Sequence, residues 1–455
     1  MKKRTQKLAA LFLTGILATA VVAGCGGGGS NSDSGVDTST AETSGSDSES
    51  AAEVSSADIG EPNGGAEVTL WHYFEHEADA LNKMVKQYNE SQSDIYVVPT
   101  FVSREELMKQ YTIGAVSGEL PDIGMVDSPD MASYISLGVF EDITEYVGDW
   151  EDLNQFYEGP LSSCKDAEGN IYGLPNNSNC LAVVCNMDIL RAAGIENPPT
   201  TWEEFRQVCE KTTNEADGVY GFAMSAISNE EGTFQYIPWL YGAGGDVTDI
   251  NSDAAVESLT FLSDLVKDGY MSKEVVNWGQ GDAYNAFLAG KAAMLELGTW
   301  QIATLDGQDA DKVTFDYQYV AMPMNGENQA TCIGGENFGV CAGSKYVAEC
   351  ADFLKSMMSA QNNADWCEIA GKLPVRGDAV GLKDFWTADE RYKVFNDSMN
   401  FAVARGPHES WPTISEAIYK AEQAAILGEK TPEDALAEAA ATINPILEEP
   451  PIAAQ

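Results

Sequence analysis

Positive charge is what this sequence has least of. Only 26 of its 455 residues are Lys or Arg, against 71 Asp or Glu, and the formal net charge is −45 at pH 7. A surface this negative repels nucleic acid and anionic lipid head groups, and a polyanionic ligand would need clustered Arg or Lys. We therefore expect no nucleic-acid partner and a ligand that is not a polyanion. The same acidity also keeps an exposed protein soluble.

Long hydrophobic runs are equally scarce. The one clear run, residues 8–23, follows a basic start at residues 2–7 and is too short to span a bilayer comfortably, which predicts a secretory signal peptide over residues 1–24. Its end, Val22-Ala23-Gly24-Cys25, resembles that of bacterial lipoprotein signals. This resemblance implies that Cys25 is lipidated and anchors an extracytoplasmic protein to the cell membrane. The alternative is an ordinary signal peptide with a chance cysteine.

Aromatic and basic residues are absent from residues 26–65, which consist mainly of Gly, Ser, Thr, Asp and Glu. Such a segment cannot bury enough apolar surface to offset the entropy lost on ordering. We expect the lipidated Cys25 and the segment up to residue 65 to form a disordered tether, with an average span of about 35 Å for a Gly/Ser-type coil. The remaining residues then form the folded body.

The sequence after residue 65 also lacks the motifs that most often indicate catalysis, including Gly-x-Ser-x-Gly, Gly-Lys-Ser/Thr, Gly-x-Gly-x-x-Gly and Cys-x-x-Cys. Residues 72–76 fit the His-x-x-Glu-His pattern of one class of zinc protease. They follow a predicted strand, however, whereas that chemistry needs both histidines on a helix. Residues 249–253 begin like a calcium loop, but Ala254 and Thr260 stand where the loop needs Gly and Glu. We expect no metal, no cofactor and no catalytic residue.

Eight cysteines remain besides Cys25: Cys164, Cys180, Cys185, Cys209, Cys332, Cys341, Cys350 and Cys367. An even number outside the cytoplasm permits disulfides, and their pairing cannot be read from the sequence. Cys209 falls on the apolar stripe of a predicted helix, together with Trp202 and Phe205. For most of the eight we therefore favour buried, small hydrophobic side chains.

The body, residues 66–455, alternates strands with helices. Apolar runs predict strands at residues 68–71, 95–102, 122–127, 171–174 and 180–186. Between them, Leu81, Met84, Val85 and Tyr88 repeat at helical spacing, and capping-box patterns begin helices at Ser103 and Thr201. This alternation predicts an α/β fold with parallel sheets, long enough for two lobes with separate cores. Ligands of such sheets bind at the carboxyl ends of the strands.

Aromatic residues gather beside polar ones at the predicted loop edges: Trp71 and Tyr73 with Glu75, Trp239 and Tyr241 before Gly242, Trp300 after Gly298, and Trp411 after Ser410. A flat indole covers the C–H face of a sugar ring, while Asp, Asn and Arg satisfy its hydroxyls. Taken singly, each of these side chains is better explained by a place in the core. Their recurrence next to Gly, Pro and Asn favours a sugar-binding cleft.

A series of short motifs runs through nearly the whole body: Gly118-Glu119-Leu120-Pro121-Asp122-Ile123, Leu137-Gly138-Val139-Phe140-Glu141-Asp142-Ile143, Tyr172-Gly173-Leu174-Pro175, Asn186-Met187-Asp188-Ile189-Leu190, Pro199-Thr200-Thr201-Trp202-Glu203-Glu204, Ala286-Phe287-Leu288-Ala289-Gly290-Lys291-Ala292-Ala293-Met294, Gly298-Thr299-Trp300, Gly334-Gly335 and Leu373-Pro374-Val375-Arg376. In this order and spacing they resemble family 1 of the extracellular solute-binding proteins, the receptors of sugar-importing ATP-binding-cassette (ABC) systems. Family members usually have Tyr where this chain has Cys185.

This resemblance implies a type II periplasmic-binding-protein-like fold, in which a hinge joins two α/β lobes and a ligand cleft lies between them. It assigns residues 66–175 and 323–373 to the first lobe, and residues 176–322 and 374–455 to the second. It also implies a monomeric binding protein without enzymatic activity, which delivers a sugar or oligosaccharide to ABC permease subunits.

Carried over to this sequence, the resemblance implies ligand contacts after the predicted strands and at the crossings between lobes: Trp71, Tyr73, Glu75, Asp127, Asn176, Asn177, Trp239, Tyr241, Trp300, Gly335, Glu336, Asn337, Arg376 and Trp411. Two alternatives stay open. The same fold could bind a non-sugar solute such as a polyamine or a metal chelate. The chain could also be a lipid-tethered secreted hydrolase, because 71 acidic residues offer many accidental carboxylate pairs.

Overall fold

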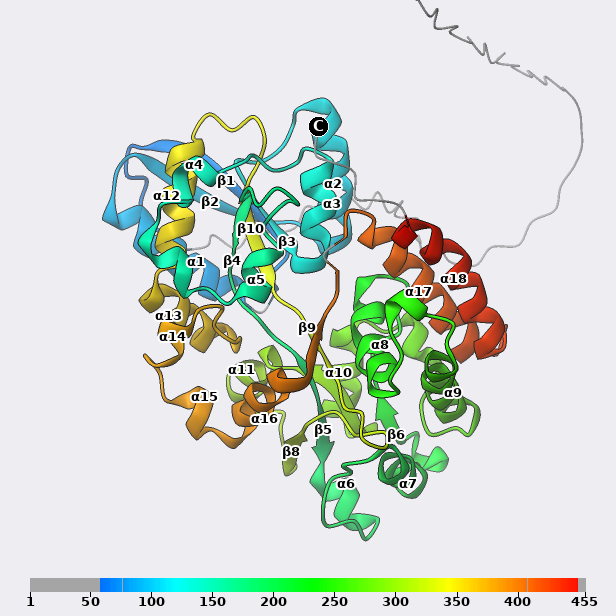
Figure 1. Cartoon of the computed structure of the whole chain (residues 1–455). Helices are drawn as coiled ribbons and strands as arrows, with labels where there is room; N and C mark the ends of the chain where they lie inside the picture. The colour runs from blue at the N-terminus through cyan, green and yellow to red at the C-terminus, as the bar shows by residue number, and fades with distance from the viewer. Residues whose placement is uncertain (1–57, 76, 407, 449–455) are drawn as a thin grey trace, which may run out of the picture. The chain divides into compact units, whose positions relative to one another are not determined.

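The computed structural model describes residues 58–75, 77–406 and 408–448, and Figure 1 colours them along the chain. The predicted signal peptide, Cys25 and residues 26–57 of the predicted tether lie outside these described residues. The last residues of the predicted tether pack against the body. Asn63 Nδ2 donates hydrogen bonds to the carbonyls of Asn89, Gln92 and Ile95, at 3.0, 2.9 and 2.8 Å respectively.

Five strands form the first sheet, in the order β2, β1, β3, β10, β4. Their bounds are β1 Ala66–His72, β2 Ile95–Phe101, β3 Ile123–Asp127, β4 Gly173–Pro175 and β10 Glu336–Val340. β1 runs parallel to β2 and β3, as the alternation of strands and helices predicts, but β10 pairs antiparallel with β3 and β4. The expectation of parallel sheets is therefore wrong for β10, which enters from a distant part of the chain and not through a helical crossover.

Four strands form the second sheet, in the order β6, β7, β5, β8. Their bounds are β5 Leu181–Asn186, β6 Tyr220–Ala223, β7 Ala292–Gly298 and β8 Tyr317–Val320. β5 is antiparallel to β7 and β8, and β6 is parallel to β7. Every residue of β5 and β7 is buried, which accounts for their nearly continuous apolar sequences. The one acid in β7, Glu296, is consequently enclosed in the core.

Helices cover both sheets (Figure 1). The first sheet and the helices beside it form the first lobe, which contains α1 Ala78–Ser91, α2 Arg104–Ser117, α3 Met131–Ser136, α4 Thr144–Val147, α5 Glu158–Ser162, α12 Val347–Met357 and α13 Ala360–Ala370. The second sheet and its helices form the second lobe, which contains α6 Met187–Ala192, α7 Trp202–Thr212, α8 Glu230–Gly242, α9 Asp253–Lys267, α10 Gln280–Leu288, α11 Trp300–Asp306, α16 Glu390–Ser398, α17 Trp411–Ile426 and α18 Pro432–Glu448. The short α14 Gly377–Val380 and α15 Phe385–Ala388 lead from α13 to α16.

Helix ends follow the sequence signals at most positions. Thr201 caps α7 by accepting a hydrogen bond from the Glu204 N–H. Ser252 likewise accepts from the Ala255 N–H and caps α9, so residues 249–253 lead into a helix. The N-cap Ser103 of α2 makes no such side-chain bond, which corrects the predicted capping box. α2 ends at Gly118, whose φ of 77° favours glycine.

Crossing segments connect the two lobes. Residues 176–180 lead from β4 to β5, and β9 (Thr331–Ile333) leads back into β10. β11 (Ala402–Ala404) pairs in parallel with β9. Backbone hydrogen bonds tie the crossings together, because Asn179 and Gly334 exchange bonds in both directions and Ser178 exchanges bonds with Leu373. Side chains that flank these crossings therefore lie between the two sheets.

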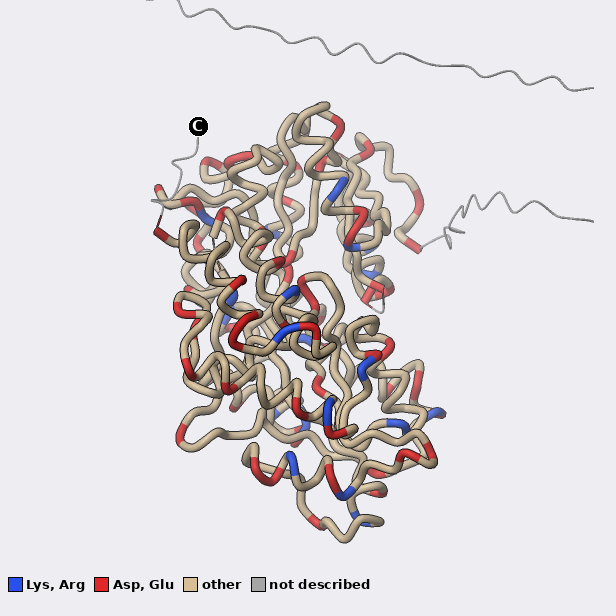
Figure 2. The backbone as a smooth tube through the Cα atoms, turned by 90° about the vertical axis from the view of Figure 1, so that its right-hand side faces the viewer, with Lys and Arg blue, Asp and Glu red and all other residues tan. Residues whose placement is uncertain are grey.

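Three features of the composition have direct counterparts in the structure. All eight cysteines of the body are unpaired and buried, which confirms the prediction of small core residues. Within the described part of the chain, no helix is both long and apolar enough to cross a membrane. Asp and Glu recur along the whole described chain, with Lys and Arg at fewer positions (Figure 2).

Candidate ligand-binding site

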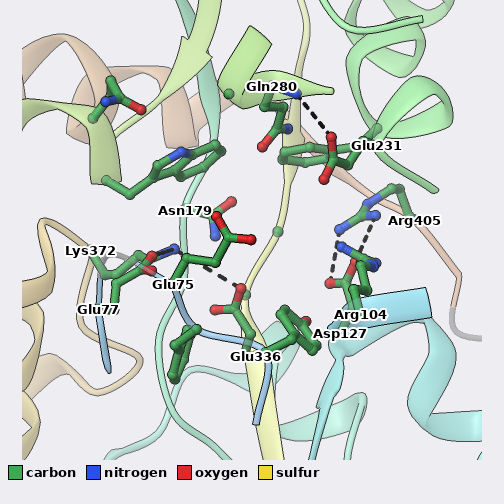
Figure 3. A pocket seen from close by; sticks show the side chains of 18 residues that line it. Glu75, Glu77, Arg104, Asp127, Asn179, Glu231, Gln280, Glu336, Lys372 and Arg405 are labelled. Atoms are coloured by element: carbon green, nitrogen blue, oxygen red, sulfur yellow. Dashed lines mark hydrogen bonds and ion pairs between the residues drawn. The ribbon is translucent and has the colours of Figure 1, made fainter. Parts of the chain in front are cut away.

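A cavity of about 210 Å³ lies where the crossing segments meet the two lobes. Its walls come from the loop after β1, the ends of α2 and β3 that face it, the crossings, the starts of α8, α10 and α11, and the segment after β11. The lining residues are Tyr73, Phe74, Glu75, Glu77, Arg104, Asp127, Asn179, Glu231, Phe234, Gln280, Gly281, Trp300, Gln301, Gly334, Gly335, Glu336, Lys372 and Arg405 (Figure 3). Both lobes thus contribute to one polar site near strand ends.

Two glycines shape the wall of this cavity by permitting close approach. A Cβ at Gly298 would lie 1.8 Å from the Trp300 ring, so glycine lets the indole fold back over the end of β7. Gly335 has a φ of +149°, and a Cβ there would lie 2.2 Å from the carbonyl oxygen of Asn177. A larger residue at Gly298 would displace the Trp300 ring, and one at Gly335 would collide with the backbone of Asn177 and Ser178.

Asp127, at the end of β3, is held between two arginines. Its carboxylate accepts a hydrogen bond from Arg104 at 2.6 Å and from both terminal nitrogens of Arg405 at 3.1 Å. Burial acts to raise the pKa of Asp127, but the charges and hydrogen bonds of Arg405 and Arg104 outweigh it and hold the pKa below its ordinary value. Asp127 is therefore ionised, and its carboxylate is already paired with Arg104 and Arg405.

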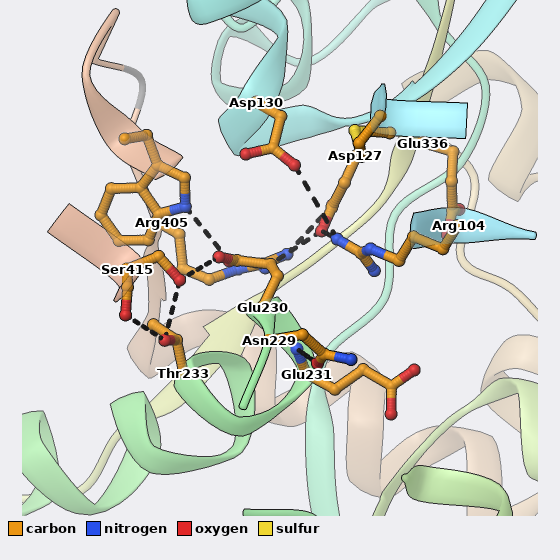
Figure 4. A network of polar contacts seen from close by, with 12 residues as sticks. Arg104, Asp127, Asp130, Asn229, Glu230, Glu231, Thr233, Glu336, Arg405 and Ser415 are labelled. Carbon is orange, nitrogen blue, oxygen red and sulfur yellow. Dashed lines mark hydrogen bonds and ion pairs between the residues drawn. The ribbon is translucent and has the colours of Figure 1, made fainter. Parts of the chain in front are cut away.

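Arg405 also connects Asp127 to the second lobe. Its guanidinium pairs with Glu230 in the first turn of α8, and Glu230 accepts hydrogen bonds from Trp411 Nε1 and Ser415 Oγ of α17 (Figure 4). Burial acts to lower the pKa of Arg405, yet the neighbouring carboxylates raise it above its ordinary value. Burial, Glu230 and Asp127 raise the pKa of nearby Asp130 to about 8. A buried ionic network thus spans both sides of the cavity.

Lys372 forms a second ionic group at the crossing after α13. Its Nζ lies 3.0 Å from Glu77 Oε1 and 4.0 Å from Glu336 Oε1, and its side chain is 4% exposed. Burial acts to lower the pKa of Lys372, but Glu336 and Glu77 outweigh it and raise the pKa. Burial raises the pKa of Glu336, with Lys372 opposing it. The ammonium is therefore charged and shared between two carboxyl groups of the wall.

Each of the three basic side chains in the cavity also covers an aromatic ring. The distances to the ring centroid are 5.3 Å for Arg104 over Tyr73, 4.7 Å for Lys372 over Trp300 and 4.3 Å for Arg405 over Phe234. The Trp300 and Phe234 rings are nearly parallel, with centroids 6.4 Å apart. The three cations therefore serve the carboxylates and rings of the protein itself.

Several lining side chains keep hydrogen-bonding capacity for an occupant, among them Tyr73, Glu75, Asn179 and Glu231. Glu75 and Glu231 form no ion pair among the described residues, although Glu231 Oε2 accepts one bond from the Gln280 N–H at 3.0 Å. Asn179 Oδ1 and Tyr73 Oη are buried without a hydrogen-bond partner in the described part of the chain. Glu75, Glu231 and Asn179 point into the same space in Figure 3. Because buried polar atoms are normally satisfied, these atoms indicate a polar occupant.

The structure brings six of the fourteen sequence-predicted contact residues to this cavity: Tyr73, Glu75, Asp127, Trp300, Gly335 and Glu336. Tyr73 and Glu75 follow β1, Asp127 ends β3, and Trp300 follows β7, so these four lie at the carboxyl ends of strands, where the sequence predicts a ligand. Gly335 and Glu336 lie instead at the amino end of β10, which is antiparallel to β3.

Four predicted aromatic contacts lie elsewhere, and the expectation is corrected for them. Trp239 is 1% exposed in the core of the second lobe, where its indole N–H donates to Glu296 at 2.7 Å. Trp411 is 2% exposed on α17. Tyr241 packs against the same core, and Trp71 packs in the first lobe beside Tyr111, with ring centroids 6.2 Å apart. Proximity to a loop did not expose these rings, because the elements around them bury large apolar side chains.

Four predicted polar contacts are also outside the cavity and at most 2% exposed: Asn176, Asn177, Asn337 and Arg376. Asn177 donates to Asn176, Asn337 donates to Ser163 Oγ at 2.9 Å, and Arg376 pairs with Asp152 and Asp378. These expectations are corrected because the four side chains are buried among partners within the protein. For Asn337 the reason is also local, since successive side chains of a strand face opposite sides. Glu336 therefore enters the cavity while its neighbour Asn337 turns away.

Sequence reasoning missed several polar residues of the wall, among them Arg104, Asn179, Glu231, Lys372 and Arg405. Two of them had a usable signal, since Asn179 continues the polar run that begins at Asn176, and Arg104 follows the predicted strand at residues 95–102. Glu231, Lys372 and Arg405 come from helical or irregular segments without a local motif.

Comparison with known proteins gives a consistent result at the level of sequence. Residues 83–394 match the family described as bacterial extracellular solute-binding protein. A binding protein of Brucella abortus is 23% identical over 403 residues, which cover 87% of this chain and 95% of the relative. The arabinooligosaccharide-binding protein of Bacillus subtilis is also 23% identical, over 73% of this chain and 78% of its own.

Among solved structures, an ABC transporter solute-binding protein of Thermotoga lettingae bound with α-D-tagatose is similar with a TM-score of 0.78. It is 24% identical, and the match covers 84% of this chain and 100% of that one. At this identity the likeness shows the fold, and it confirms the predicted α/β architecture of two lobes.

Proposed function

Because this chain belongs to the bacterial extracellular solute-binding protein family, we propose that it is the substrate-binding protein of a carbohydrate ABC importer. It captures a sugar or oligosaccharide between its two lobes and delivers it, chemically unchanged, to the permease subunits. An arabinooligosaccharide-binding relative and a tagatose-bound structural neighbour support a saccharide ligand.

The observation that carries this proposal is a cavity in which aromatic edges stand beside unpaired polar atoms. Sugar hydroxyls donate and accept hydrogen bonds in fixed directions, and the ring C–H groups pack on aromatic side chains. Tyr73 and Asn179 offer buried atoms without partners in the described residues, and Trp300 and Phe234 offer the rings. We propose Tyr73, Glu75, Asp127, Trp300, Gly335 and Glu336 as ligand contacts or their direct supports, with Asn179 and Glu231 added from the structure.

Ligand capture is proposed to close the two lobes about the crossing segments. The lobes are taken as residues 66–175 with 323–373, and residues 176–322 with 374–455. Closure follows when a ligand makes contacts in the closed state that it lacks in the open one. Small-angle scattering should therefore show a smaller radius of gyration with ligand, and an unchanged radius despite tight binding would contradict the hinge.

The protein is proposed to act as a monomer, held at the outer face of the cell membrane by lipidated Cys25. One acyl chain binds a membrane marginally and two hold it firmly, so a diacylglyceryl cysteine retains the protein. In cells, Cys25→Ala should move the mature body from the membrane fraction to the soluble fraction. Continued membrane retention would overturn the lipoprotein assignment.

A thermal-shift screen against a panel of sugars and oligosaccharides tests the function itself. A true ligand at ~100 times its Kd adds about 2.7 kcal/mol to the free energy of unfolding and raises Tm. Chromatography of the recovered ligand then separates a receptor from the alternative of a tethered hydrolase, because a receptor returns its ligand intact. A panel without any stabilising sugar would overturn the proposal.

A further inference from the structure

We propose that the ligand of this cavity carries positive charge, as a saccharide with protonated amino groups does. This inference rests on the proposed sugar-binding function and narrows its substrate class. Two independent features carry it: the balance of charge on the cavity wall, and the kind of hydrogen-bonding atom that the wall leaves unused.

The charge balance is negative after the internal pairs are accounted for. All three cations of the wall are committed to neighbouring carboxylates, Arg104 and Arg405 to Asp127 and Lys372 to Glu77. Arg405 has a further anionic partner in Glu230, outside the lining, and Lys372 has one in Glu336. Glu75 and Glu231 therefore face the cavity with no neutralising cation among the described residues.

The unused atoms of the wall are mainly acceptors. Asn179 is 4% exposed, and its Oδ1 lacks a partner in the described part of the chain. Carboxylate oxygens such as those of Glu75 and Glu231 accept hydrogen bonds, whereas an ammonium group supplies three donors and needs no donor in return. The wall also keeps two unused buried donors, Gln301 Nε2 and Arg405 Nε, but the acceptor atoms outnumber them. This excess of acceptors favours a ligand rich in hydrogen-bond donors, as an ammonium group is.

Lys372 is an ammonium group of the protein that this wall already binds. Its ammonium lies 4.7 Å from the Trp300 ring centroid and 3.0 Å from Glu77, almost completely buried. The wall thus already stabilises one ammonium with an indole face and carboxyl groups. Glu75 and Glu231, which point into the same space in Figure 3, offer a ligand ammonium equivalent carboxylate partners.

An anionic saccharide fits this wall poorly. To bind a phosphate or a uronic acid, Arg104 and Arg405 would have to exchange Asp127 for the ligand. Asp127 is buried between them, and separating a buried ion pair leaves an uncompensated charge. The three cations of the cavity are accordingly structural partners of the wall and do not form an anion-binding cluster.

Titration calorimetry with matched oligosaccharides tests the inference. The probes are β-1,4-linked oligomers of glucosamine, N-acetylglucosamine and glucose of equal length, measured below neutral pH, where the free amines are protonated. We expect the glucosamine oligomer to bind at least about tenfold tighter than its acetylated counterpart. We also expect that advantage to shrink as salt is added, because exposed charges are screened.

A double variant assigns the preference to the two free carboxylates. Glu75→Gln combined with Glu231→Gln should reduce the glucosamine preference by about tenfold. The matched control, Glu203→Gln combined with Glu210→Gln on α7, changes the net charge equally at exposed positions outside the cavity and should keep the preference.

The outcomes separate this inference from the function on which it rests. Equal or tighter binding of the neutral oligomers, or of a sugar phosphate, would overturn the positive charge and leave the sugar-binding function standing. An equal loss of preference in the α7 control would overturn the assignment to Glu75 and Glu231. Binding of a free polyamine with no binding of any saccharide would overturn the sugar-binding function.

Discussion

Two buried sites in this protein leave polar atoms unpaired among the described residues, and they differ in what lies beside those atoms. In the ligand cavity, Asn179 Oδ1 and Tyr73 Oη line open space. In the core of the second lobe, Glu296 of β7 and Glu422 of α17 are both 0% exposed, and both oxygens of Glu422 lack a partner. A ligand can complete the first site, whereas tightly packed side chains enclose the second.

The two sites also differ in the protonation of their buried carboxyl groups. Burial raises the pKa of Glu296 and of Glu422 well above the ordinary range, and each gains little from neighbours, so burial favours the neutral form of both carboxyl groups. Asp127 beside the cavity is as deeply buried, yet Arg405 and Arg104 keep it ionised. Unpaired atoms therefore indicate binding only where they line open space. In a closed core they indicate a stability that depends on pH.

The largest effect that separates the two sites is expected from Trp239→Ala in the closed core. The indole fills the centre of this core and donates the hydrogen bond that Glu296 accepts. Its removal leaves a cavity and a further unpaired oxygen, and we expect the free energy of unfolding to fall by about 3–5 kcal/mol. Urea denaturation measures the loss. Normal stability with weakened sugar binding would show that Trp239 belongs to the ligand site.

Trp300→Ala makes the complementary change in the open cavity. Trp300 is only partly buried and lines the cavity, so we expect ligand affinity to fall by about 2 kcal/mol, roughly thirtyfold. Calorimetry gives the affinity, and the unliganded Tm should fall less than in Trp239→Ala. Unchanged affinity together with the larger loss of Tm would place Trp300 in the core and remove it from the ligand contacts.

Local sequence patterns were sufficient for much of the fold. The apolar spacing of Leu81, Met84 and Val85 predicts the buried face of α1, and the apolar run at residues 180–186 predicts strand β5. Trp300 could be placed at the cavity for the same reason, because it follows a strand end directly. Such inferences succeed where the information lies within a few residues of the chain.

The rest of the site depends on contacts that no local pattern contains. Arg405 reaches Asp127 across 278 residues of sequence, and the crossing segments alone bring the two together. Adjacent residues can also face opposite sides, as Glu336 and Asn337 do. Trp239 and Trp300 look alike in sequence because both stand near glycine, and only the packing of α8 against the second sheet separates them.

A smaller, pH-dependent effect is expected from Glu422→Gln. Unfolded Glu422 ionises near its ordinary pKa of 4.5, whereas burial keeps the folded group protonated to much higher pH. Its contribution to stability is therefore fully present below about pH 4.5 and is lost as pH rises toward the folded pKa, by up to about 1.4 kcal/mol per pH unit. Glutamine cannot ionise, so the variant should exceed the wild type in stability at neutral pH, and the difference should shrink on acidification.

Urea denaturation at a series of pH values measures this difference. Glu416→Gln on the exposed face of the same helix is the matched control, and it should change the pH dependence little. Parallel pH profiles of Glu422→Gln and the wild type would show that the core carboxyl group is not the source of the effect.

The finest comparison uses two tyrosines whose hydroxyl groups both lack partners in the described residues. Tyr73 lines the ligand cavity, and Tyr319 is 3% exposed in the core beside β5. Tyr73→Phe should weaken sugar binding by about 1 kcal/mol, because a ligand hydrogen bond is lost, with little change in unliganded Tm. Tyr319→Phe should leave affinity unchanged and raise the free energy of unfolding by up to about 1 kcal/mol, because an unsatisfied buried hydroxyl is removed. Calorimetry measures the affinity of both variants, and urea denaturation measures their free energy of unfolding. If Tyr73→Phe changed stability and left affinity unchanged, as expected for Tyr319→Phe, the Tyr73 hydroxyl would not contact the ligand. The distinction between the two sites would then fail at this residue.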